Sequence, residues 1–350
     1  MKRILKQAVG IDVAQKELVV CIGRIYDDWT IELYAHKTFA NTAKGFAILL
    51  AWVQKQTSAD MHVHFVMEAT GVYHEQLAYY LDEQDCTISI VLPNKISNYF
   101  KTLEVKTITD KTSSEAIARF GLERKLEQWK RPKAIYRKLR QLTRERDQIV
   151  QERTIVKNQL HAEQTEALPH KKTIKRIEQR IALLDKQDKE IQAELQEMMT
   201  KEDKEMRAMI VILCSIPGVG LLTAATVLAE TNGFDLIRNK RQLASYAGFD
   251  VKEKESGTSV KSIPKISKRG NKYLRKAMHL PALAAIRHDE RFKAVFVRLV
   301  SKHGIKMKAA VAVQRKLLEL MFTLTSKKEK YDKNHFVNQQ QKQECKAIIS

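Results

Sequence analysis

The sequence has few of the residues that mark zinc ribbons, redox couples and membrane spans. Its 350 residues include only four cysteines, and no two of them form a CxxC pair. This spacing gives no indication of a zinc ribbon or a dithiol couple, and it favours a reduced, cytoplasmic setting. No apolar run reaches 18 residues, and the N-terminus passes directly into a strand pattern, which argues against a membrane span and a signal peptide.

Acidic residues are also in the minority. The chain has 41 Asp and Glu against 62 Lys and Arg, which gives a formal net charge of +21, while 44% of its residues are hydrophobic. A chain of this length and hydrophobic content is expected to fold into two or three domains with real cores. So large a charge on a folded protein favours a polyanionic partner, and nucleic acid is the leading candidate over a surface that is charged only for solubility.

Two runs of heptad-like spacing divide the chain near its middle and meet at Pro169, which favours a hairpin. The spacing predicts a helical hairpin packed on its own domain or, because so long a seam buries little without a partner helix, a homodimer or homotetramer. Polar residues interrupt the seam at Arg146, Arg153 and Asp188. The apolar members are Leu139, Leu142, Ile149, Val156 and Leu160 in the first run, and Ile174, Ile177, Ile181, Leu184, Ile191, Leu195 and Met198 in the second.

The first 130 residues alternate between strand and helix patterns. Residues 8–24 read as two strands joined by a tight turn, and further strands are expected at 29–35, 62–68 and 87–92. Helices are expected from Asn41–Thr42 through residue 53, and again over 77–81. The order strand, strand, strand, helix, strand, helix, strand is that of a ribonuclease-H-like domain. We therefore predict an α/β domain followed by an all-α region.

Three acids occupy positions in this pattern that favour metal chemistry. Asp12 lies in the middle of an apolar strand, Glu68 ends the fourth strand, and Asp110 lies at a helix start. A buried carboxylate without a partner either neutralises or binds a cation. If the three acids converge, they are suited to two Mg²⁺ or Mn²⁺ ions, which serve phosphodiester cleavage. Simpler explanations stay open, because Asp110 is a good N-cap and Glu68 an ordinary strand-end residue.

The region after residue 204 reads as helical and strongly basic. Between residues 251 and 276 nine Lys and Arg face only two Glu. Ser256 lies in this segment, where cationic neighbours would stabilise an alkoxide and a pentavalent phosphate, although such a serine is more often a plain loop residue. A Gly-rich turn before the helix at 221–229 exposes N–H groups suited to a phosphate. We expect nucleic-acid contacts from Gly218, Gly220, Lys265, Lys268, Arg269, Asn271 and Arg275.

Several motifs in order resemble the DEDD transposases of bacterial insertion sequences, the insertion-sequence one-ten family, which also resembles the Piv DNA invertase. They are GIDVAQKE, MEATGVYHE and TDKTSSEAIARFG in the first domain, and SIPGVGLLTAATVLAE, QLASYAGFD, ESG and SKRGNKYLRKA in the last. The resemblance covers nearly the whole chain. It implies a RuvC-like catalytic domain at 1–130, a coiled middle at 131–204, a helical transposase domain at 205–330 and a polar tail at 331–350.

The resemblance also implies a mechanism and a set of partners. Asp12, Glu68 and Asp110 take three acidic roles in metal binding, and Ser256 of the ESG motif takes the role of nucleophile. Family members act on donor and target DNA, are directed by a structured RNA from their own element, and join the acids of one protomer to the serine of another. A bacterial, nucleoid-associated location follows.

The chain departs from the family pattern at Ser113, where the fourth acid is expected. Residues 110 and 113 share a helix face, whereas Glu115 points about 140° away. A neutral hydroxyl is a weak magnesium ligand, so metal binding at this place is expected to be weaker.

Three functions therefore stay open. The leading interpretation is an RNA-guided, magnesium-dependent recombinase with a serine nucleophile. The alternatives are a RuvC-like nuclease in which the acids do all the chemistry, and a nucleic-acid-binding protein with weakened catalysis.

Overall fold

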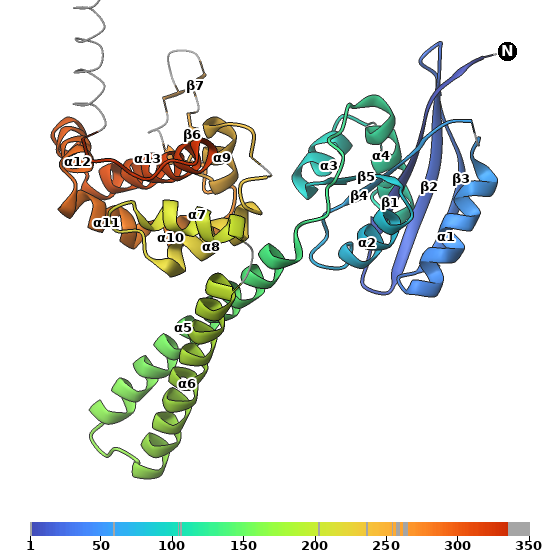
Figure 1. The fold of residues 1–350 in the computed structure, drawn as a ribbon. Coiled ribbons are helices and arrows are strands. Elements are labelled where there is room, and N and C mark those ends of the chain that lie inside the picture. Colours follow the sequence, from blue (N-terminus) through green and yellow to red (C-terminus); the bar gives the residue numbers. More distant parts are fainter. Residues whose placement is uncertain are drawn as a thin grey trace, which may run out of the picture. The chain divides into compact units, whose positions relative to one another are not determined.

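The structure is a computed structural model that describes residues 2–334 except 59, 104, 106, 202–203, 236, 254, 257–259 and 262–264. The chain forms two compact units, Met1–Arg131 and Pro132–Ser350 (Figure 1). Most of the predicted polar tail, from residue 335 on, lies outside the described residues. Among the helices that are described, none combines the length and apolar character needed to cross a membrane. The predicted domain boundary at residue 204 stays a prediction.

The first unit is built on a five-stranded mixed sheet with the order β3-β2-β1-β4-β5. The first three strands form an antiparallel meander, and β4 and β5 run parallel to β1. This is the predicted ribonuclease-H-like arrangement, and the predicted fold class is confirmed. The elements are β1 (Ile4–Val13), β2 (Glu17–Tyr26), β3 (Ile31–Ala40), α1 (Ala43–Gln56), β4 (Val63–Glu68), α2 (Glu75–Glu83), β5 (Thr87–Val91), α3 (Pro93–Phe100) and α4 (Asp110–Glu123).

Apolar side chains cover both faces of this sheet, as the alternation in the strands requires. On one face Val9 and Ile11 of β1 join Leu49 of α1 in one buried cluster. On the opposite face Val66 of β4 packs with Ile117 of α4. Helices on both faces explain why the central strand β1 is apolar along most of its length.

Three local expectations for this unit are corrected. Trp29 does not begin the third strand but lies in the preceding turn with φ of 64°, and β3 begins at Ile31. Asp12 lies next to the last residue of β1 instead of in its middle. Thr109, whose side chain accepts a hydrogen bond from the Thr112 amide, is the N-cap of α4, so capping does not account for Asp110.

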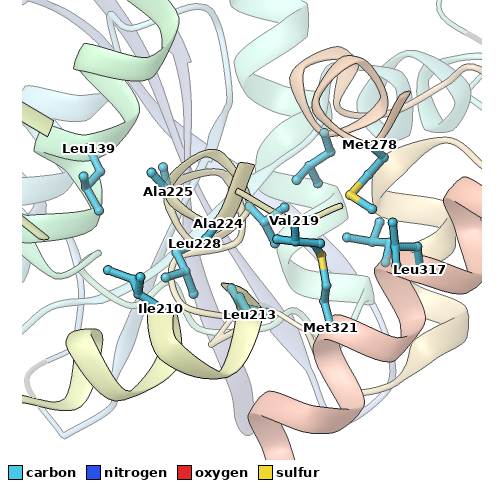
Figure 2. Packing of buried hydrophobic residues seen from close by; sticks show 14 of the residues in the cluster. Leu139, Ile210, Leu213, Val219, Ala224, Ala225, Leu228, Met278, Leu317 and Met321 are labelled. Carbon is cyan, nitrogen blue, oxygen red and sulfur yellow. The ribbon is translucent and has the colours of Figure 1, made fainter. Parts of the chain in front are cut away.

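The second unit is helical apart from two short ladders. Its core contains residues from across the unit, including Leu139 of the first long helix, Leu213, Leu228 and Met321 (Figure 2). The elements are α5 (Ala134–Thr165), α6 (Lys171–Lys201), α7 (Lys204–Cys214), α8 (Leu221–Thr231), α9 (Lys240–Ala247), β6 (Val251–Lys252), β7 (Glu255–Ser256), β8 (Val260–Lys261), β9 (Lys265–Ile266), α10 (Lys272–Ala277), α11 (His279–His288), α12 (Glu290–His303) and α13 (Lys306–Lys327).

The helices α5 and α6 form the hairpin that the heptad runs predict (Figure 1). The premise that the seam needs a partner chain is wrong, because the two helices cover each other and bury residues such as Val156 and Leu184. The polar interruptions also pair within the hairpin. Asp188 lies 2.7 Å from Nε of Arg146 and 3.2 Å from Nη1 of Arg153. A homodimer or homotetramer therefore stays a prediction that the seam itself does not support.

Candidate active site

The candidate active site begins with the close approach of α4 to β1. A Cβ atom added to Gly10 would lie 2.2 Å from the Ala118 nitrogen and 2.3 Å from the Ser114 carbonyl oxygen, so only glycine leaves room for the helix. Gly121, one turn further on, would place a Cβ 2.7 Å from the Val66 side chain. The helix thus lies directly on the sheet, and its first residue, Asp110, is one turn from the point where Gly10 touches Ser114.

Asp12 and Glu68 come from adjacent parallel strands. The register pairs Ile11 with Met67, so the next residues, Asp12 and Glu68, lie side by side at the carboxyl ends of β1 and β4. Parallel strands end at the same edge of a sheet, and α4 begins over that edge. The strand register and the packing of α4 together bring the three predicted acids to one place.

Their mutual repulsion appears in the pKa of Asp12. Partial burial raises that pKa first, and the negative charges of Asp110 and Glu68 raise it further, to about 6, against a hydrogen bond from the Val13 amide that lowers it. Burial also raises the pKa of Glu68. Carboxylates that destabilise one another in this way are stabilised by a cation.

The donor set fits a hard divalent cation, since carboxylate oxygens are the ligands that Mg²⁺ prefers. In the described part of the chain, however, no three His, Cys, Asp or Glu side chains are close enough to form a ligand cluster. The acids are therefore near enough to influence one another but are not arranged in a closed coordination shell.

The place of the fourth acid follows the sequence argument. Ser113 is half-buried on α4, one turn after Asp110. Glu115 points elsewhere, because its Oε1 lies 2.9 Å from Nε2 of His36 on β3. That Glu115 does not replace the fourth acid stays a prediction, and its pairing with His36 is consistent with it.

Ser256 belongs to a small ribbon between α9 and α10. β6 pairs with β9 through Val251 and Ile266, and β7 pairs with β8 through Ser256 and Val260, both antiparallel. The ladders place the backbone of Ser256 inside the basic segment. We call the four strands β6, β7, β8 and β9 the serine ribbon.

The residues predicted to bind nucleic acid divide into exposed and inward-facing groups. Lys265, Lys268 and Arg269 are exposed. Arg275 is turned inward, because its Nη1 donates to the Ala247 carbonyl oxygen at 2.7 Å. Asn271 is also turned inward, and a phosphate contact is not needed to explain either residue.

The two glycines in the turn before α8, Gly218 and Gly220, have different surroundings. Gly218 has φ of +84°, and a Cβ there would lie 2.7 Å from the Pro281 carbonyl oxygen, so it is required by packing against α11. Gly220 is the N-cap of α8 without a side-chain cap, and nothing lies within 4 Å of its missing Cβ. Of the two, Gly220 is the one with open space beside it.

Two family profiles match the chain, one over the region of the three acids and one over the region of Ser256. A profile of DEDD transposases of the IS110 type matches residues 9–169, and a profile described as "Transposase IS116/IS110/IS902 family" matches residues 211–296. The chain belongs to the IS110 family of transposases. As an IS110-family transposase it is an enzyme of DNA strand cleavage and exchange. The first profile includes Asp12, Glu68 and Asp110, and the second includes Ser256.

Individual relatives agree with the family. The transposase is 26% identical over 329 residues to each of two proteins named "Pilin gene-inverting protein", from Moraxella lacunata and Moraxella bovis, which covers 94% of this chain and 98% of each relative. A solved structure of RuvC from Thermus thermophilus matches 35% of the transposase and 99% of RuvC at 9% identity, with a TM-score of 0.27.

Sequence reasoning missed two polar residues that organise the transposase. Asn41 was expected only to open a helix, yet its Nδ2 donates to the carbonyl oxygens of Ala14 at 2.9 Å and Tyr73 at 3.2 Å, which ties the loops beside Asp12 and Glu68 together. Glu230 is a buried carboxylate in an apolar helix. An acid in such a run is itself a signal, since it needs a partner.

Proposed function

We propose that this IS110-family transposase moves its own insertion sequence by cutting and rejoining DNA, with Ser256 as nucleophile and with Asp12, Glu68 and Asp110 as ligands of divalent metal ions. The single observation that carries the proposal is the placement of the three acids at one edge of the sheet, where the strand register sets Asp12 beside Glu68 and the packing of α4 on Gly10 brings Asp110 near them. Structural acids are normally paired with cations, whereas the pKa of Asp12 is raised by two other acids, Asp110 and Glu68.

The acids would hold Mg²⁺ or Mn²⁺. Bound there, the ions would activate the oxygen that attacks the phosphodiester and would stabilise the negative charge on its leaving oxygen. Ser113 contributes no negative charge, so we propose that the metal is held by three carboxylates with water in the remaining place. Its affinity is then lower than that of a site with four acids.

Ser256 would attack the scissile phosphorus. Its Oγ–P bond forms, the P–O bond of the DNA backbone breaks, and the proton of the serine leaves with the released strand hydroxyl. Attack of another strand's hydroxyl on the serine ester reverses these steps and restores a phosphodiester. The number of phosphodiester bonds is conserved, so strand exchange needs no external energy source.

We also propose a structured guide RNA and an oligomer of two or four chains. The resemblance to RNA-directed members of the family supports the RNA, as does the basic character of the helical unit. Target choice would then lie in base pairing and leave the protein to bind backbone phosphates. Light scattering with and without RNA would give the molar mass of the assembly and therefore the number of chains in it.

The test is the Ser256→Ala variant, incubated with labelled DNA that spans an end of the insertion sequence and with RNA transcribed from the element. Removing one hydroxyl changes the chemistry and leaves charge intact, so DNA and RNA binding should persist while the covalent protein–DNA adduct and strand exchange disappear. An adduct that persists would assign the nucleophile elsewhere, with Ser267 next. Hydrolytic cleavage without any adduct in the wild type would establish the RuvC-like nuclease instead.

A further inference from the structure

The buried carboxylate of Glu230, in the last turn of α8, joins three separate segments of the helical unit. Its side chain is 1% exposed. Arg144 of α5 donates to both of its oxygens, from Nε to Oε1 at 2.7 Å and from Nη2 to Oε2 at 2.8 Å. Asn271 donates from Nδ2 to Oε2 at 2.6 Å. The backbone oxygen of Glu230 accepts from the Tyr246 hydroxyl at 2.9 Å.

These contacts reach both ends of the serine ribbon. Tyr246 belongs to α9, which leads into β6, and Asn271 follows β9 as the N-cap of α10. The backbone amide of Asn271 also donates to the Tyr246 carbonyl oxygen at 2.8 Å. Glu230 is therefore bonded to the segment before the ribbon and to the segment after it.

Further bonds hold the two strands together at the base of the ribbon. The Ser267 amide donates to the Asp250 carbonyl oxygen at 2.7 Å, and the Ser267 hydroxyl donates to Oδ1 of Asp250 at 2.6 Å. The base is thus closed by Asp250 and Ser267, while its orientation relative to α5 and α8 depends on Asn271 and Tyr246. Both of these converge on Glu230.

Asn271 is fully engaged by this arrangement. Its Oδ1 accepts from the amides of Tyr273 at 2.9 Å and Leu274 at 3.1 Å, which caps α10, while its Nδ2 serves Glu230. The two functions use different atoms of one amide. A serine at this position would keep an oxygen for the cap and lose the donor to Glu230.

Stability alone gives little reason for an ion pair at this place. Removing the Glu230 carboxylate from water costs free energy, the Arg144 side chain is still 40% exposed, and an apolar replacement of similar volume is often neutral or stabilising. A bidentate Arg–carboxylate pair instead fixes direction as well as distance. Such a pair is suited to hold a segment in one orientation.

We propose that Glu230 is a positioning residue for catalysis, whose carboxylate orients the serine ribbon through Asn271 and is itself held by Arg144. The inference rests on the proposed role of Ser256. It goes beyond that role because it assigns the placement of the nucleophile to a residue outside the ribbon.

The test compares Glu230→Gln and Asn271→Ser in the full-length protein with the guide RNA and labelled DNA spanning an end of the insertion sequence. We expect the single-turnover rate of adduct formation at saturating DNA to fall on the order of 100-fold in each, the scale of a misplacement of about 1 Å. The DNA dissociation constant should stay at the wild-type value, because the Asn271 side chain is engaged with Glu230 and with the start of α10, and neither substitution removes a positive charge. Rates are measured where urea titration shows each variant to be folded.

The two substitutions should not be additive, because both act on the link between Glu230 and Asn271, so the double variant should react no more slowly than the slower single variant. Asn271→Ser keeps the Arg144–Glu230 pair and guards against a misfolded Glu230→Gln protein. The matched control is Glu319→Gln on α13, which breaks a pair with Arg315 of similar length, 2.7 Å, and should react at the wild-type rate.

The outcomes separate this inference from the proposed function. Wild-type rates in both folded variants, with Ser256 still required for the adduct, would overturn the positioning role and leave the nucleophile in place. Multiplicative effects in the double variant would also overturn it. An adduct that persists in Ser256→Ala would overturn the proposed function itself.

Discussion

The two units of this transposase differ in how they hold the residues that matter. Residues 1–131 contain 17 basic and 16 acidic residues, whereas residues 132–350 contain 45 and 25, so nearly all of the net charge of +21 belongs to the helical unit. In the first unit the acids are placed by backbone packing, since strand register sets Asp12 beside Glu68 and the Gly10 contact sets α4 over them. In the second, Ser256 lies on a two-residue ladder whose base is held by side-chain bonds.

The difference fits the functions proposed for the two sites. Carboxylates that share a cation must be held against their own repulsion, which requires rigid, extensively packed elements. A nucleophile carried between two helices needs an anchor that fixes both ends of its segment. The placement of the acids and the packing of the helical unit can be tested separately.

The largest expected effect is the loss of cleavage in Asp12→Asn. The substitution keeps the shape of the side chain and removes a negative charge from the metal site, so cleavage should fall at least about 100- to 1,000-fold, the scale for losing one electrostatic contact to a transition state. The measurement is cleavage rate against Mg²⁺ concentration. Glu115→Gln is the control on α4. Glu115 pairs with His36 instead of the other acids, so this variant should cleave at the wild-type rate. Normal cleavage by Asp12→Asn would make the acids structural.

The next effect concerns stability of the helical unit. Asp188 is 5% exposed and pairs with Arg146 and Arg153, so Asp188→Ala leaves two cations in the seam and should cost about 3–5 kcal/mol in urea unfolding. Asp185→Ala removes a more exposed partner of Arg153 and should cost less than about 1 kcal/mol. Asp188→Leu should not recover the loss, because Arg146 and Arg153 would still lie in the seam without Asp188. Equal losses in the two alanine variants would contradict a hairpin seam closed within the chain.

A smaller effect compares one glycine from each unit. Gly10→Ala forces α4 away from β1 and should destabilise the first unit by about 1–3 kcal/mol. Because Asp110 moves with α4, cleavage should also need a higher Mg²⁺ concentration to reach its maximum rate. Gly220→Ala meets nothing within 4 Å and should change stability by less than about 0.5 kcal/mol. Chemical denaturation of both variants measures the difference. A tolerated Gly10→Ala would show that the close approach is not required for the site.

The smallest effect is a pH dependence without metal. The folded-state pKa of Asp12 is raised to about 6 from its usual value near 4, so the folded protein binds more protons in this window, and Asp12 removes stability as pH rises from about 4 to 6. The loss should be about 1 kcal/mol after allowance for partial exposure. His64, whose pKa burial lowers to about 4, acts with the opposite sign in the same window.

The difference between wild type and Asp12→Asn therefore isolates the carboxylate. Urea midpoints in EDTA at pH 4, 5 and 6 should show the variant gaining on the wild type as pH rises. Saturating Mg²⁺ should shrink that gain, because the ion favours the ionised acid. A constant difference across the three pH values would mean that Asp12 titrates normally.

Much of the fold follows from local patterns in the sequence. Alternating apolar residues predict the strands, the heptad spacing predicts α5 and α6, and Pro169 predicts the turn between them. Asp12 and Glu68 were found because carboxylates in apolar strands are conspicuous, and Asp110 because it lies at a helix start. These features depend on neighbours within a few residues, which is the range over which side-chain period carries information.

Tertiary structure decided the features that depend on distant pairs. Only the folded chain shows that α4 rests on Gly10, that α5 covers the seam of α6, and that Asn271 and Arg275 face inward. The same holds for Glu230, whose partners are 86 and 41 residues away along the chain. An acid in an apolar helix indicates that some partner exists, but the partner is selected by packing geometry, which no local periodicity encodes.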